Sequence, residues 1–280
     1  MTNPDYHTIR WAGGKRWLLK HFDEFTPQSY NNYHEPFIGG ASVFLHLNPP
    51  KHAYLSDSNA ELINAYQQIR DNLEKVWSIL KTYKNTKEEY YTIRDKANYR
   101  VAHKKAARFL YLNRTSFNGI YRVNLKGIYN VPYGFKEYKC LFEYNKLKRL
   151  SERLQGTNLI HCDFADCLQN INESDLVYLD PPYTVTHSKN SFIKYNEVLF
   201  SWEQQIKLAT FITKIREKKA YFILSHAKHR KVISLFGDLG KNVILKRHSA
   251  IGGKNAKREL VEEYVFYSKN GGYAGECDII

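Results

Sequence analysis

The sequence predicts an α/β fold in which a doubly wound sheet is interrupted by a mostly helical segment. Close to the N-terminus, apolar runs ending in Glu35 and Asp57 alternate with helical patterns, which is the strand, turn and helix order of such a sheet. The apolar spacing is then helical from about residue 62 to 112, and strands and helices alternate again after residue 158. We therefore expect a Rossmann-like sheet with an insert between its two parts.

The elements before the insert are predicted from glycine turns and helix caps. A Gly-Gly turn precedes a helix expected from about Arg16 to Phe25, and a second one follows Glu35-Pro36 and leads into a helix near Ala41. The next strand is expected at residues 53–56, with a helix starting near Ser58 or Asn59.

The insert itself is expected to carry a β-hairpin. After the helical stretch, two β-like runs flank Asn124-Leu125-Lys126-Gly127, a sequence typical of a hairpin turn, and a helix is expected from about Leu141 to Leu154. Beyond the insert we expect strands at 158–163, 176–179, 220–225, 243–248 and 262–268 and helices at 202–218 and 228–236.

These elements divide the chain into three parts. A discontinuous catalytic domain is expected at residues 1–60 and 153–270, an inserted recognition domain at 61–152, and a C-terminal tail at 271–280.

Composition favours a nucleic-acid partner. The formal net charge is +14, and aromatic residues make up 15% of the chain. Basic and aromatic side chains together bind phosphates and stack on bases, although many basic proteins carry only solvated charge. No apolar run of eighteen residues and no signal-peptide core is present, so we expect a cytoplasmic protein without a membrane partner.

The sequence does not predict a metal site. The four cysteines form no C-x-x-C pair, and no H-E-x-x-H is present. His226 and His229 are three residues apart, but no nearby cysteine or carboxylate completes a zinc set.

A glycine turn and an acid suggest a nucleoside-containing cofactor. Gly39 and Gly40 let the backbone approach a ligand between a strand and a helix, and Asp57 ends the next strand at a spacing typical of ribose-binding acids. The alternatives are a tight turn for the glycines and a helix N-terminal carboxylate for Asp57, but the two features together favour the cofactor.

The stretch "DLVYLDPPYTV" (175–185) predicts a catalytic corner at a strand end. An adenine N6 amino group needs two acceptors for its hydrogens as the nitrogen becomes tetrahedral. The Asp180 carboxylate and the Pro181 carbonyl supply them, Pro182 helps to fix the corner, and Tyr183 can stack on the base. Because that amino group lies inside duplex DNA, the base has to be flipped out of the helix.

Four segments in order make the chain resemble the Dam-type, D12-class DNA adenine-N6 methyltransferases, which include GATC-specific enzymes. They are "WAGGK" (11–15), "EPFIGGASVF" (35–44), "NRTSFNGIYRVNLKGIYNVPYG" (113–134) and "YLDPPY" (178–183). The likeness covers essentially residues 9–268. It implies a sheet that binds S-adenosylmethionine (SAM), methyl transfer to adenine N6 without a metal, and a double-stranded DNA substrate.

The resemblance also implies roles for individual residues. Expected at the cofactor are Trp11, Lys15, Phe37, Gly39, Gly40, Asp57 and Asp180. Without the motif order, the preferred interpretations are a core ring for Trp11 and a surface charge for Lys15.

The hairpin is expected to read the target sequence. An arginine on a hairpin can contact guanine O6 and N7 in the major groove, and an aromatic ring can wedge between bases. The positions that match the family's hairpin are Phe117, Asn118, Ile120, Arg122 and Pro132. Arg10 stands where related enzymes can carry a base-contacting lysine, and Lys254, Lys257 and Arg258 suit phosphate contacts. Arg122 could instead form a surface salt bridge and Phe117 could be a core ring.

Two rival functions stay open at the level of the sequence. One is a SAM enzyme of the same fold acting on cytosine N4 or on adenine in RNA. The other is a DNA-binding protein that retains the fold without activity. A monomer is expected, and the sequence leaves open whether a companion restriction endonuclease acts on the same site. The one departure near the site is Ser225-His226, where some relatives have Ser-Asn.

Overall fold

The chain folds into two compact units. The computed structural model describes residues 8–47, 49, 51–96, 99–124, 126–183, 200–248, 260–268 and, by backbone alone, 277–279. The unit called here the helical unit comprises residues 1–15, 38–48 and 55–161, and the sheet unit comprises 16–37, 49–54 and 162–280. The boundaries predicted for the recognition domain, 61–152, stay a prediction.

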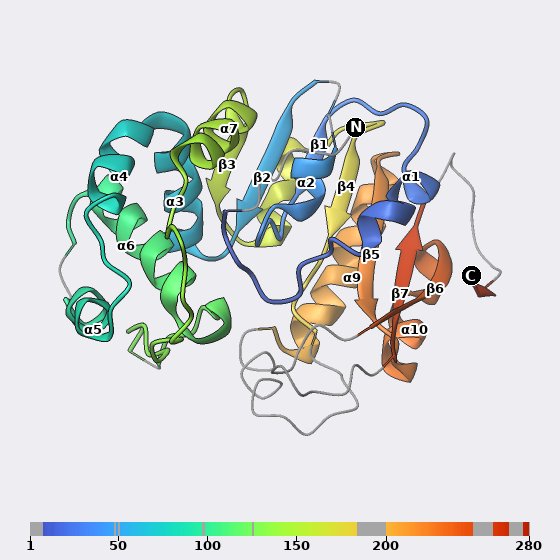
Figure 1. The fold of residues 1–280 in the computed structure, drawn as a ribbon. Coiled ribbons are helices and arrows are strands. Elements are labelled where there is room, and N and C mark those ends of the chain that lie inside the picture. Colours follow the sequence, from blue (N-terminus) through green and yellow to red (C-terminus); the bar gives the residue numbers. More distant parts are fainter. Residues whose placement is uncertain are drawn as a thin grey trace. The chain divides into compact units, whose positions relative to one another are not determined.

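The strands are arranged in the order β3-β2-β1-β4-β5-β7-β6-β8. Strands β1, β4 and β5 run parallel to one another, β7 is antiparallel to both β5 and β6, and β8 is parallel to β6. Their bounds are Tyr33–Glu35 (β1), Ala53–Asp57 (β2), Asn158–His161 (β3), Leu176–Leu179 (β4), Tyr221–Ala227 (β5), Lys241–His248 (β6), Leu260–Tyr267 (β7) and Cys277–Ile279 (β8). This mixed sheet with helices confirms the predicted α/β fold class (Figure 1).

The core of the sheet unit forms around β4 and β5. All four residues of β4 are buried, as are the central five of β5, which is typical of strands covered on both faces. Helices α9 (Trp202–Glu217) and α10 (Arg230–Phe236) pack against each other. The unit also contains η1 (Leu18–His21), α1 (Phe22–Phe25), η3 (Phe164–Asn170) and η4 (Gly237–Leu239). This rigid strand pair fixes the position of the residue that follows β4.

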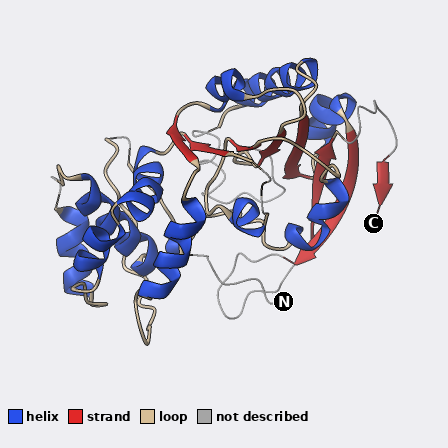
Figure 2. Cartoon of the chain, turned by 90° about the horizontal axis from the view of Figure 1, so that it is seen from above, coloured by secondary structure: helices blue, strands red, loops and turns tan. Residues whose placement is uncertain are grey.

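The helical unit is built on α3 and α6, which pack against each other. Figure 2 shows the helices of the chain joined by loops. Asn59 caps α3 by accepting a hydrogen bond from the Leu62 N–H, and Thr86 caps α5 in the same way. Its helices are α2 (Ser42–His46), α3 (Ala60–Asp71), α4 (Leu73–Leu80), α5 (Lys87–Asp95), α6 (Ala102–Thr115), η2 (Phe117–Gly119) and α7 (Tyr144–Leu154). The predicted run of helices between residues 62 and 112 is confirmed.

The structure differs from the prediction at both ends of the chain. The helix expected from Arg16 to Phe25 is two short turns, η1 and α1, and begins at Leu18. Residues 277–279, for which the sequence predicted only a C-terminal tail, form strand β8 beside β6. Residues 277–279 form a strand because their backbone pairs with β6, and a short tail sequence does not specify such pairing.

Candidate active site

In the sheet unit, Asp180 stands immediately after β4 and is held from β5. The Ser225 hydroxyl donates a hydrogen bond to Asp180 Oδ1 at 3.0 Å. The Tyr178 hydroxyl lies 3.1 Å from Ser225 Oγ and, since the one hydrogen of Ser225 goes to Asp180, donates to it. Burial and the nearby Asp180 charge raise the pKa of Tyr178 well above its ordinary value, which keeps it protonated. The carboxylate is thus anchored through one oxygen.

The two prolines make the corner after Asp180 stiff. Pro181 is buried and Pro182 is half-buried, and neither has an N–H that could extend the β4 ladder. The chain therefore leaves the sheet at a defined point, with the Pro181 carbonyl still able to accept a hydrogen bond.

Tyr183 is fixed at both its hydroxyl and its ring. Its hydroxyl donates to Glu263 Oε2 at 2.7 Å, and its ring stacks on the His226 imidazole, with centroids 5.0 Å apart and planes inclined by 20°. Burial and the charges of Glu263 and Asp180 raise the pKa of Tyr183 well above its ordinary value. Tyr183 is therefore a neutral aromatic ring beside the Asp180 corner.

In the helical unit, the predicted glycine turn is closely packed against Trp11. Gly39 has φ +45°, and a Cβ there would come within 2.7 Å of Trp11 Cδ1, so only glycine fits. Ala41, which opens α2, also has a positive φ of 56°. Such backbone strain in a non-glycine residue is typical of functional turns.

Asp57 joins this turn to the end of β2. Its carboxylate accepts hydrogen bonds from the Gly39 N–H at 3.2 Å and from the Asn59 N–H at 3.0 Å. Burial raises the pKa of Asp57 to about 6, and the N–H groups of Asn59 and Gly39 partly oppose that rise. A half-buried carboxylate that accepts hydrogen bonds, beside a glycine turn and an indole ring, fits the ribose hydroxyls and the adenine ring of SAM.

Two other predicted cofactor residues lie inside the helical unit. Trp11 stacks on Tyr121, with centroids 5.7 Å apart, and is half-buried, so the ring is both packed and partly accessible. Lys15 is only 3% exposed, and its Nζ donates to the Gly13 carbonyl at 2.8 Å. The alternative that Lys15 is a surface charge is therefore wrong.

Phe37, the remaining predicted cofactor residue, belongs to the sheet unit. Its ring packs against Phe164 and Phe200, with centroid distances of 5.3 and 5.8 Å. In the structure Phe37 packs at the edge of the hydrophobic core, and its contact with a cofactor stays a prediction.

The predicted recognition segment does form a short antiparallel hairpin. Val123 and Tyr129 form a β-bridge, and the Asn130 N–H donates to the Arg122 carbonyl at 3.1 Å. Gly127 at the turn has φ +72°. The Arg122 guanidinium is exposed, and its Nε donates to Asn130 Oδ1 at 2.8 Å. The predicted hairpin is confirmed, and Arg122 is oriented by an amide across the hairpin instead of by a salt bridge.

The other predicted DNA-contacting residues lie near the base of this hairpin. Phe117 is 51% exposed, so the alternative of a core ring is wrong, and Asn118 has a left-handed φ of 55°. Ile120 is half-buried and Pro132 is exposed, and the Pro132 carbonyl accepts from the Phe117 N–H at 2.9 Å.

Arg10 is tied to the same segment through its backbone. Its N–H and carbonyl bond the Asn113 side chain at 2.8 and 2.7 Å, and its guanidinium lies over the Tyr138 ring. Lys254, Lys257 and Arg258 fall outside the described residues.

Sequence reasoning did not single out Glu263, Arg247 or Gln205. A usable signal existed for Glu263. Successive strand residues point to opposite faces, so one of the adjacent Glu262 and Glu263 had to face inward. Glu263 is the buried one, at 1% exposure.

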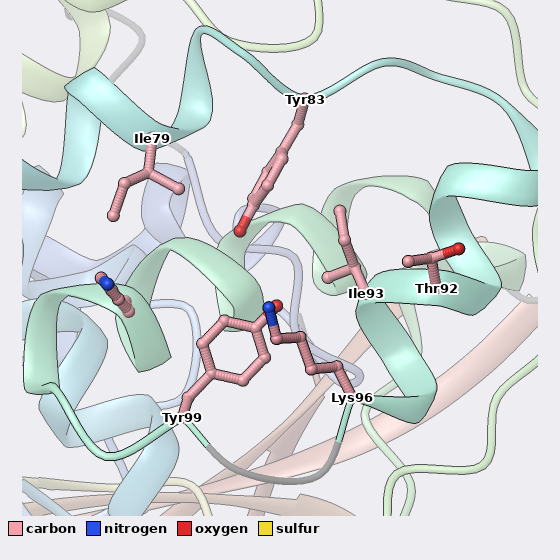
Figure 3. A pocket seen from close by; sticks show the side chains of 7 residues that line it. Ile79, Tyr83, Thr92, Ile93, Lys96 and Tyr99 are labelled. Carbon is pink, nitrogen blue, oxygen red and sulfur yellow. The ribbon is translucent and has the colours of Figure 1, made fainter.

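A pocket of about 260 Å³ lies among the helices of the helical unit (Figure 3). It is lined by Ile79, Tyr83, Thr92, Ile93, Lys96, Tyr99 and Lys104, none of which was predicted to bind cofactor or DNA.

In the described part of the chain, no group of three or more metal-ligating side chains is arranged to hold an ion. None of the described helices combines the length and the apolar character needed to cross a membrane.

Comparison with known proteins identifies the family. Residues 11–249 match the family described as D12 class N6 adenine-specific DNA methyltransferase. A type II methyltransferase of Lactococcus lactis subsp. cremoris is 32% identical over 265 residues, covering 91% of this chain and 93% of the relative. A type II methyltransferase of Methanocaldococcus jannaschii is 30% identical over 280 residues (91% and 96%). The DNA adenine methylase of Escherichia coli is 29% identical over 270 residues (94% and 95%). The resemblance drawn from the four motifs is thereby confirmed, and the chain belongs to the D12 class of N6 adenine-specific DNA methyltransferases.

Proposed function

We propose that this chain transfers a methyl group from S-adenosylmethionine to the N6 amino group of an adenine flipped out of double-stranded DNA, within the sequence GATC. The observation that carries the proposal is the Asp180 corner. One carboxylate oxygen is held by Ser225 at 3.0 Å, so the group has a fixed orientation at the end of β4.

The chemistry required of the protein is positioning. The N6 lone pair is delocalised into the ring, and it becomes nucleophilic only as the nitrogen turns tetrahedral. The Asp180 carboxylate accepts a hydrogen bond from one amino N–H and the Pro181 carbonyl accepts one from the other, which stabilises that geometry. After the methyl group is bound, the nitrogen releases one of these two protons and keeps the other. Tyr183 stacks on the base and replaces part of the stacking energy lost when the base leaves the duplex.

The cofactor role is assigned residue by residue, each by its own chemistry. When bound, SAM supplies the methyl group from its sulfonium centre. Asp57 would accept hydrogen bonds from the ribose hydroxyls, and the Gly39-Gly40 turn would let the backbone approach the ligand. The family resemblance adds Trp11, Lys15, Phe37 and Asp180.

Target recognition is assigned to the segment 61–152 and its hairpin. Arg122, already oriented by Asn130, would read a guanine edge in the major groove. Phe117, Asn118, Ile120 and Pro132 would contribute base contacts with Arg10, and Lys254, Lys257 and Arg258 would bind phosphates. The net charge of +14 supports duplex DNA as the partner.

The cellular setting follows from the substrate. We place the protein in the cytoplasm as a monomer without a metal cofactor. The names of the two type II relatives support a companion endonuclease that cuts the same site.

The test is methylation of duplex oligonucleotides that contain GATC or single-base variants of it, followed by mass analysis of the nucleosides. We expect N6-methyladenine in the GATC duplex only. Asp180→Ala should abolish methyl transfer while duplex binding stays largely intact. N4-methylcytosine as the product, or transfer by Asp180→Ala at near the parent rate, would contradict the proposal.

A further inference from the structure

Tyr183 is held by two side chains that lie outside the four motifs carrying the resemblance: His226 contacts its ring and Glu263 binds its hydroxyl. His226 covers one face of the ring, and it is fixed in turn by Gln205, whose Oε1 lies 3.2 Å from His226 Nε2. Both His226 and Gln205 are fully buried. A base that stacks on Tyr183 must therefore use the opposite face of the ring.

The Tyr183 hydroxyl is anchored to β7 through Glu263. Glu263 accepts the phenolic hydrogen on Oε2, while Oε1 is ion-paired with Arg247 Nε. Leu245 lies directly opposite Glu263 in the β6–β7 ladder, which places Arg247 at the diagonal position. The guanidinium of Arg247 lies over the Trp17 ring, 5.6 Å from its centroid. Both carboxylate oxygens are thus used, which compensates the burial of the charge.

We infer that Glu263, oriented by Arg247, is a positioning residue that sets the Tyr183 ring for stacking on the target base. Stacking on His226 alone still allows the Tyr183 ring to shift and rotate within its own plane. A hydrogen bond at the far end of the ring removes that freedom, because the hydroxyl can reach Glu263 from only a narrow range of ring positions. The inference rests on the proposed function, in which Tyr183 receives the flipped adenine.

Glu262 provides a matched control on the same strand. Its carboxylate pairs with Lys228 Nζ at 2.7 Å and is about one-third exposed. Glu262→Ala removes a carboxylate from the neighbouring residue, which points to the opposite face of β7. Any effect specific to Glu263 then reports on its contacts and not on the loss of a negative charge from the strand.

The experiment is a double-mutant cycle between Tyr183→Phe and Glu263→Ala, with Glu263→Gln and Glu262→Ala alongside. For each full-length variant, kcat and KM for a GATC duplex are measured. The fluorescence of a duplex with 2-aminopurine at the target position reports stacking of the flipped base. The free energy of unfolding is measured for the same set.

We expect kcat to fall about tenfold to a hundredfold in Tyr183→Phe and in Glu263→Ala. The double variant should be no slower than the slower single one, because both remove the same hydrogen bond. Glu263→Gln keeps an acceptor and should recover part of kcat, the 2-aminopurine signal should change in step with kcat, and Glu262→Ala should match the parent.

Independent, multiplicative losses in kcat would overturn the inference. So would coupling that appears in the free energy of unfolding but not in kcat or fluorescence, since that result assigns the hydrogen bond to stability alone. A parent protein that fails to methylate adenine would instead refute the proposed function, so the two failures are distinguishable.

Discussion

Replacement of Asp57 by asparagine tests whether its carboxylate is held for a cofactor. The side chain lies at the end of β2, where burial raises its pKa from 3.8 to about 6. Ionisation of Asp57 at neutral pH costs folding free energy, so the position of this carboxylate does not stabilise the fold by itself. A ligand that donates hydrogen bonds to the carboxylate, as ribose hydroxyls do, recovers that cost.

The magnitude follows from linkage between the proton and folding. Between pH 3.8 and about 6 the folded protein holds the Asp57 proton more tightly than the unfolded chain does, so the free energy of unfolding falls as the pH rises. One pKa unit corresponds to 1.36 kcal/mol, so the loss approaches about 3 kcal/mol above pH 6. The side chain is partly exposed, which makes this an upper bound. Asp57→Asn lacks this titration.

The assay is chemical denaturation of the parent and of Asp57→Asn from pH 4 to 8, with and without SAM. We expect the difference in unfolding free energy to change by up to about 3 kcal/mol across pH 4–6.5 and then to level off. The affinity of the parent for SAM should weaken by up to about tenfold per pH unit below pH 6, and that of Asp57→Asn should be nearly flat. Parallel pH profiles for the two proteins, in both measurements, would refute the reasoning.

Three further substitutions test the site and the hairpin. Ser225→Ala removes the hydrogen bond to Asp180 and should lower kcat about tenfold with little change in duplex affinity, and an unchanged kcat would remove Ser225 from the site. Arg122→Ala should cost about 1–3 kcal/mol of site discrimination in a panel of duplexes, while Asn130→Ala, which frees the guanidinium, should cost about 1 kcal/mol. Gly39→Ala should destabilise the protein by about 1–3 kcal/mol in thermal unfolding, and a parent-like stability would contradict the close packing of the turn.

The sequence predicted most of the fold because its strands and helices have clear periods and caps. The stretch Leu176–Leu179 is uniformly apolar, and it forms a strand with all four residues buried. Asn59 was one of two expected starts of a helix, and it is the cap of α3. The segment after Gly13-Gly14 was harder. Its apolar residues fit a helix, but the structure has two short turns there, from which Phe22 and Phe25 contact Tyr178 of β4 and Tyr267 of β7.

The residues that line the predicted site divide into those with a local signal and those without one. Asp180 and the glycine turn stand at strand ends, where local sequence marks a break in structure. Glu263 and Arg247 lie within strands, and only the pairing of β6 with β7 brings them together beneath Tyr183. No local pattern specifies that pairing, since it depends on the register in which two strands pair.

The two central carboxylates illustrate why the same side chain suits two tasks. Asp57 is half-buried and is held by two backbone N–H groups, and its raised pKa makes its charge sensitive to what binds there. Asp180 is held by a hydroxyl, which fixes one oxygen and does not neutralise the charge. A binding carboxylate gains selectivity when a ligand must stabilise its ionised form, whereas an acceptor in a reaction must be ionised and oriented before the substrate arrives. The environment of Asp57 therefore matches a binding role, and that of Asp180 matches a positioning role. If their surroundings were exchanged, neither carboxylate would suit its role.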